Sequence, residues 1–91
     1  MVNRLILLVL AFTALTLGPV QASATLVVNS LTDVVVDDGF CTLREAIIAA
    51  NTDTSSGEQN GECIAGNGND VVDLSGLDGT LVLSNMLPDI T

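Results

Sequence analysis

The sequence predicts a small, mostly β protein that contains one short capping α-helix. Short apolar runs rich in β-branched residues alternate with turns of Gly, Asp and Asn, a pattern typical of strands in a stacked β architecture. Only residues 42–50 repeat their apolar side chains at clear helical spacing. The chain has 91 residues, which leaves room for at most one small domain.

Residues 1–24 predict a signal peptide. Arg4 supplies an early positive charge, the apolar run Leu5–Leu17 follows, and Gly18-Pro19 end it. Ala22-Ser23-Ala24 then places small residues at the two positions that a signal peptidase reads. A membrane span needs about 20 apolar residues, so the run is too short for one. We therefore expect an exported protein, secreted or at the cell surface, with no membrane span after cleavage.

The remaining residues, 25–91, are strongly acidic and lack several reactive side chains. They contain eleven acids and a single base, Arg44, and the whole chain has no His, Lys, Trp or Tyr. Such a chain cannot neutralise phosphates, which argues against nucleic-acid binding. Catalysis by a histidine base or a lysine Schiff base is excluded by composition. We expect no resident cofactor.

The strand candidates flank the helical segment. Each is short and apolar, and a Gly- or Asp-containing turn such as Gly76–Gly79 separates the later ones. Leu87–Thr91 begins a further segment of the same kind. The expected strands are Thr25–Asn29, Asp33–Asp37, Asp70–Leu74 and Thr80–Ser84.

The segment Thr42–Ala50 predicts a helix with a capping box. Thr42 is a good N-cap, and Glu45 stands three residues later, where its carboxylate also suits the helix dipole. Asn51 is the expected stop. The face predicted to be buried consists of Leu43, Ala46, Ile47 and Ala50.

Cys41 and Cys63 are the only cysteines, and both follow the predicted signal peptide. Export to an oxidising compartment favours a disulfide between them. This bond would pin the polar loop Asn51–Asn69 to the start of the helix and contribute about 3 kcal/mol of stability. The alternative is two separate buried thiols. A zinc site would be two ligands short, because the chain has no His.

Residues 41–51 read CTLREAIIAAN and resemble the CSLREA-type amino-terminal domain of exported bacterial proteins. Thr42 stands where the family pattern has Ser, and both residues cap helices. The likeness extends to a preceding strand, a second cysteine in a Gly/Asn-rich loop and the run DVVDL, so it covers most of residues 25–91. The matching residues are Cys41, Leu43, Arg44, Glu45, Ala46, Ile47, Ala49, Ala50 and Asn51.

The resemblance implies the amino-terminal cap and first coil of a right-handed, pectate-lyase-like parallel β-helix. Family members typically continue into further coils, so the resemblance implies an incomplete or truncated form with downstream β-helix coils as its partner. It implies a structural module without catalytic residues. The apolar side chains that would need cover from such coils are Val71, Leu74, Leu81, Leu83 and Leu87.

An enzymatic alternative is a fragment of a polysaccharide lyase or hydrolase whose active site lies on missing coils. The acidic cluster of Asp33, Asp37 and Asp38 contains the paired carboxylates that glycoside hydrolysis uses. No sugar-stacking ring accompanies it, so a solvated turn is the favoured interpretation. Arg44 and Glu45 are likewise expected to be structural: Glu45 caps the helix, and Arg44 pairs with a nearby acid or a backbone carbonyl.

The third hypothesis is a calcium-binding surface protein. Ala65–Asp73 nearly matches the nonapeptide GGxGxDxUx that binds calcium between stacked repeats. Gly66 and Gly68 would let carbonyl groups approach the ion, and Asp70 would supply a carboxylate oxygen. Only one copy is present, which favours an ordinary loop that leads into a strand.

Overall fold

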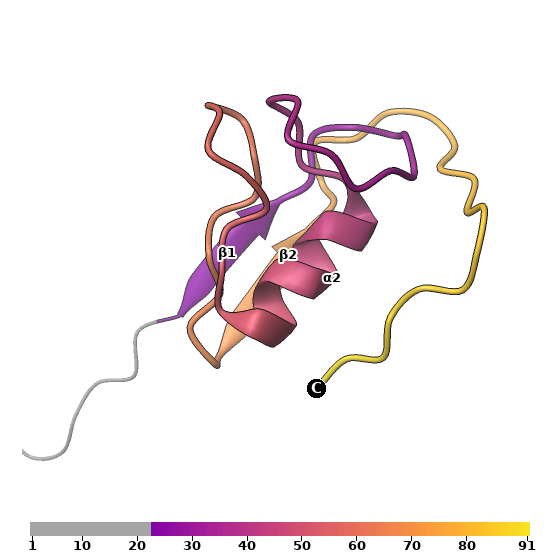
Figure 1. Cartoon of the computed structure of the whole chain (residues 1–91). Coiled ribbons are helices and arrows are strands. Elements are labelled where there is room, and N and C mark those ends of the chain that lie inside the picture. Colours follow the sequence, from indigo (N-terminus) through magenta and orange to yellow (C-terminus); the bar gives the residue numbers. More distant parts are fainter. Residues whose placement is uncertain (1–22) are drawn as a thin grey trace, which may run out of the picture.

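The computed structural model describes residues 23–91 of the chain (Figure 1). These residues form strand β1 (Ala24–Val27), helix α2 (Leu43–Thr52) and strand β2 (Asp70–Asp73). The predicted signal peptide lies outside the described residues except for its last two. Within residues 23–91, no helix is long and apolar enough to cross a membrane.

Strands β1 and β2 pair in parallel, with Ala24 opposite Asp70 and Val27 opposite Asp73. The Val28 amide extends this pairing beyond β1 by donating to the Asp73 carbonyl at 3.0 Å. Parallel neighbours need a long crossover between them, and α2 lies within that crossover, against the strand pair (Figure 1). The two strands start or end within two residues of the positions expected from the sequence.

The core lies between this strand pair and α2. Alternate side chains along β1 and the residue after it, Ala24, Leu26 and Val28, are buried, while Thr25 and Val27 are exposed, as the two-residue period of a strand requires. The helix contributes the small side chains of Ala46 and Ala49 to this core. The other core members are Cys41 and Cys63.

Helix α2 begins with the predicted capping box. The Thr42 hydroxyl accepts a hydrogen bond from the Glu45 amide at 3.1 Å, and the Glu45 carboxylate accepts one from the Thr42 amide at 2.9 Å. The expected stop at Asn51 is wrong, because the helix runs on to Thr52. It ends where Asp53 adopts a left-handed backbone conformation with φ of 53°.

The expected strands over residues 33–37 and 80–84 are not formed in the structure. Backbone groups of both segments bond to side chains instead of to a neighbouring strand. The Val36 amide donates to the Glu45 carboxylate at 2.7 Å, and the Val34 carbonyl accepts from the Thr42 hydroxyl at 2.8 Å. The Ser84 amide donates to Asp33 at 2.7 Å. Strand propensity alone does not make a strand where no partner edge is aligned.

Cys41 and Cys63 form the predicted disulfide, and both residues are buried. Glu62, next to Cys63, ties the same loop to the chain before α2, since its carboxylate accepts bonds from the amides of Asp38 and Gly39, each at 2.7 Å. The loop backbone passes so close that a Cβ on Gly61 would collide with the Gly39 carbonyl oxygen. The long polar loop is thus held at several points.

Candidate functional site: a polar clamp on helix α2

The chain makes two laps, and the second follows the first in the same order and direction. The first lap consists of β1 and then α2, and the second consists of β2 and then residues 84–91, here called the C-terminal segment. Strand β2 runs parallel to β1. The C-terminal segment runs back along the flank of α2 (Figure 1), since the helix contacts residues 85 and 86 near its start and residues 89 and 91 near its end.

Asp33, Arg44 and Asn51 hold the C-terminal segment, and we call them the clamp. Arg44 forms a two-pronged ion pair with Asp33, with Nε–Oδ1 at 2.8 Å and Nη2–Oδ2 at 2.9 Å. The same guanidinium donates to the carbonyls of Met86 at 2.8 Å and Asn85 at 2.9 Å. Arg44 therefore pairs both with an acid and with backbone carbonyls, the two alternatives expected from the sequence.

The ion pair is well shielded: the Asp33 side chain is 5% exposed and that of Arg44 is 14% exposed. Hydrogen bonds from Arg44, and then from the Ser84 amide, hold the pKa of the Asp33 carboxyl well below its usual range. The Asp33 carboxylate in turn raises the pKa of Arg44. Both groups stay charged, and both are used to bind the C-terminal segment.

Asn51 binds the far end of the C-terminal segment. Its Nδ2 donates to the Asp89 carbonyl at 2.7 Å, and its Oδ1 accepts from the Thr91 amide at 3.0 Å. The side chain thus offers one donor and one acceptor, as a neighbouring strand would. Its seven-residue spacing from Arg44 places both on one helix face, and this spacing was the available signal for a shared role.

An apolar hollow of about 400 Å³ lies where the second lap leaves β2. Its wall combines residues of the first lap, such as Leu31 and Leu43, with residues that follow β2. Leu74 and Leu83, both expected to need cover, are more than 40% exposed in it. We call it the leucine hollow, and its lining is Leu31, Leu43, Leu74, Leu77, Gly79, Leu81 and Leu83.

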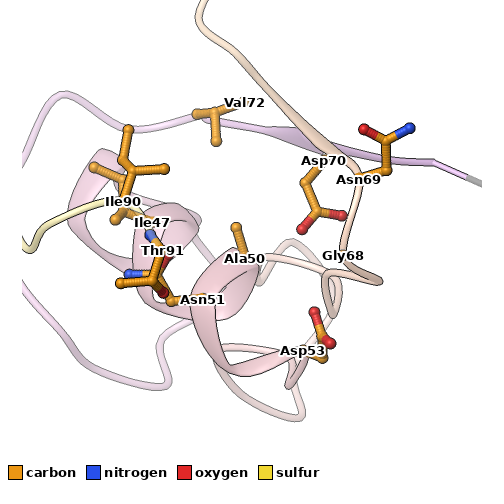
Figure 2. Close-up of a pocket in the computed structure, with 10 residues that line it drawn as sticks. All are labelled: Ile47, Ala50, Asn51, Asp53, Gly68, Asn69, Asp70, Val72, Ile90 and Thr91. Atoms are coloured by element: carbon orange, nitrogen blue, oxygen red, sulfur yellow. The ribbon is translucent and has the colours of Figure 1, made fainter.

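A second, more polar hollow of about 570 Å³ lies between α2, the turn before β2 and the last two residues (Figure 2). Asp53 and Asp70 both line it, together with Gly68 of the calcium candidate. One oxygen of Asp70 accepts a hydrogen bond from the Asn67 amide at 2.8 Å, so this carboxylate shapes the turn. Among residues 23–91, no group of three or more His, Cys, Asp or Glu side chains is placed to hold a metal ion.

Gly66, the other glycine of the calcium candidate, has a packing role. A Cβ at this position would lie 2.8 Å from the Ala50 Cα and 3.0 Å from the Ala49 carbonyl oxygen. The Gly66 amide also donates to that carbonyl at 3.2 Å. Glycine is therefore required where the loop crosses the end of α2.

The three aspartates considered for glycoside hydrolysis serve different parts of the chain. Asp33 belongs to the clamp. Asp37 accepts bonds from the amides of Glu58 and Gln59, and Asp38 accepts one from the Phe40 amide at 3.1 Å. Each carboxylate thus organises a separate stretch of backbone.

Comparison of the chain with models of known protein families, with curated proteins and with solved structures finds no match. The likeness to the CSLREA-type domain therefore depends on the sequence pattern alone, chiefly on residues 41–51. In the structure the polar side chains of this pattern all secure the chain: Cys41 by the disulfide, Thr42 and Glu45 by the cap, and Arg44 and Asn51 by the clamp.

Proposed function

We propose that this chain is an exported, non-catalytic module that caps the amino-terminal end of a parallel β-helix and starts its coils. The two-lap arrangement is the observation that carries the proposal. The chain's first lap contains α2, whose backbone hydrogen bonds are made within the helix. A helix offers no open backbone edge, so strands cannot add on that side of the stack.

The greater exposure of apolar side chains in the second lap supports growth from that lap. In the first lap the inward-facing Leu26, Ala46 and Ala49 are buried. Other large apolar side chains of this lap are 36–60% exposed, namely Val27, Val34, Val35, Val36, Phe40 and Ile48. Several apolar side chains of the second lap remain 42–88% exposed, namely Val71, Leu74, Val82, Leu83, Met86 and Ile90. Further coils stacked on this lap would bury them, as neighbouring units do in solenoid proteins.

The charge of the chain favours coils of a β-helix over a second copy as the cover. Residues 25–91 carry one base and eleven acids, and Arg44 is already paired with Asp33. Two such surfaces would repel each other at low ionic strength. The disulfide between Cys41 and Cys63 supports the exported location, because such bonds persist in oxidising compartments.

The capping role can be tested by fusion. Residues 23–91 are placed before a parallel β-helix domain from which its own amino-terminal cap has been removed, and monomer content is measured by light scattering. We expect the fusion to be monomeric and to unfold cooperatively, while the uncapped domain associates through its open edge.

A variant in the leucine hollow tests whether this surface is the one that contacts the β-helix domain. Leu83→Asp places a charge in the leucine hollow at a residue that is 42% exposed in the free chain, so the module itself should still fold. The capped fusion should lose its monomeric state in this variant. Association of the unmodified fusion to the same extent as the uncapped domain would refute the proposal.

A further inference from the structure

The clamp binds the C-terminal segment almost entirely through its main chain. Asp33, Arg44 and Asn51 make six hydrogen bonds to residues 84–91, and five of these involve backbone atoms of that segment. The exception is the hydroxyl of Ser84, which donates to Asp33 at 2.9 Å.

We propose that Arg44 and Asn51 make one face of α2 a docking site for an extended polypeptide backbone, and that this site sets the register of the second lap. The occupant is the C-terminal segment of the same chain. Two neighbouring strands are aligned by hydrogen bonds between their backbones. A helix cannot make such bonds to a neighbour, because its backbone groups are already bonded within the helix. Arg44 and Asn51 provide donors and an acceptor in its place.

The spacing of the two residues fits this role. Seven residues of helix rise about 10 Å, and three residues of an extended chain span about the same distance. The Arg44 guanidinium reaches the Met86 carbonyl, and the Asn51 amide reaches the Asp89 carbonyl, three residues further on. The two contacts form together because carbonyls three residues apart match side chains seven residues apart on the helix.

Two of the segment's apolar side chains, Met86 and Ile90, contribute little to this contact, whereas Leu87 and Pro88 are partly buried. Met86 is 88% exposed and Ile90 is 85% exposed. A site that recognises carbonyl and amide groups tolerates changes at such positions. The exposed side chains of Met86 and Ile90 therefore remain available to pack against a further coil. This role for the exposed side chains rests on the proposed capping function, whereas the docking of the segment on α2 does not.

Hydrogen exchange of single amides, followed by NMR on the disulfide-intact chain, tests the docking site. The Thr91 amide donates to Asn51, so Asn51→Ala should speed its exchange about tenfold while the circular dichroism of α2 stays unchanged. The matched control is Thr52→Ala, whose hydroxyl bonds only within the helix, to the Ile48 carbonyl, and it should leave Thr91 protected.

A second comparison tests whether the main chain is what is recognised. The double variant Met86→Ser, Ile90→Ser should keep the exchange rates of the Ser84 and Thr91 amides within about twofold of the unmodified chain. Loss of protection in this variant, or unchanged exchange of Thr91 in Asn51→Ala, would overturn the inference. Either result leaves the fusion test of capping unaffected, so the two proposals can fail separately.

Discussion

The buried carboxylate of Glu45 accepts a hydrogen bond from the backbone amide of Val36 at 2.7 Å. Its other oxygen accepts from the Thr42 amide within the capping box. One side chain thus joins the start of α2 to the chain segment nine residues earlier. Only 1% of Glu45 is exposed and Thr42 is fully buried, so the Thr42 amide depends on this carboxylate rather than on water.

Replacement of Glu45 by Ala should therefore lower the free energy of unfolding by about 3 kcal/mol, because two amide donors lose their acceptor and a cavity forms. Glu45→Gln keeps one carbonyl oxygen as an acceptor and should cost about half as much. Urea unfolding followed by circular dichroism measures both. Equal stability of Glu45→Ala and the unmodified chain would show that the cap is dispensable.

Gly61 and Gly68 form a matched pair for testing the close loop packing. Both have left-handed backbones, with φ of 97° and 96°, but only Gly61 faces another backbone, the carbonyl of Gly39. Gly68→Ala should cost about 1 kcal/mol from its conformation alone. Gly61→Ala should cost about 2 kcal/mol more, because the loop must move. Similar unfolding midpoints for the two variants would contradict the observed packing.

Stability should fall as the solution is acidified. Asp33, Glu62 and Asp73 all have a lowered pKa in the folded chain, caused mainly by bonds from Arg44, Ser56 and Ser75 respectively. A carboxylate with a lowered folded-state pKa contributes stability above its unfolded pKa of about 4 and loses it as the pH falls through the folded value. The thermal midpoint should therefore decrease below about pH 4.

Acid also relieves repulsion among the eleven acidic residues, so the contribution of the clamp needs a variant. Asp33→Asn should be less stable than the unmodified chain at pH 7, and the difference should shrink as the pH falls below about 4, where the unfolded chain takes up a proton at Asp33 while the folded chain still holds this carboxyl ionised. A difference that grows on acidification would contradict the ion pair's role.

The start of the folded chain can be tested separately. Ala24 is the first residue of β1, is only 8% exposed and lies opposite Asp70, yet cleavage at the boundary expected from the sequence would remove it. A chain that begins at Thr25 should be about 1 kcal/mol less stable than one that begins at Ser23. We therefore expect an exported chain to start at Ser23, after Ala22.

Chains that begin at Ser23 and at Ala24 provide the control, because Ser23 is exposed and should contribute little. Denaturant unfolding ranks the three forms, and mass spectrometry of the exported protein identifies its first residue. Equal stability of all three forms would show that the boundary after Ala24 is compatible with the fold.

Local sequence rules predicted the elements that local interactions determine. The capping box needs only residues 42–45, and the short apolar runs that contain most of β1 and β2 are a local signal for strands. The disulfide followed from cysteine count and the expected compartment. These features were predicted because few competing partners exist for each of them.

The clamp could not be predicted in the same way. Asp33 and Ser84 are 51 residues apart, and their hydrogen bond depends on how the second lap returns past α2. The same contact takes up the amide of Ser84, the last residue of the strand expected over residues 80–84. Asn51 was assigned as a helix stop because Asn often ends helices, but here its side chain binds a distant segment.

Binding of an environment-sensitive apolar dye to the folded, disulfide-intact chain tests the central claim most directly. The account predicts that the native monomer binds the dye at the leucine hollow, and that Leu83→Asp lowers the fluorescence while the secondary structure persists. A monomer that unfolds cooperatively and binds no dye in its native state would contradict the claim that this surface is built to be covered.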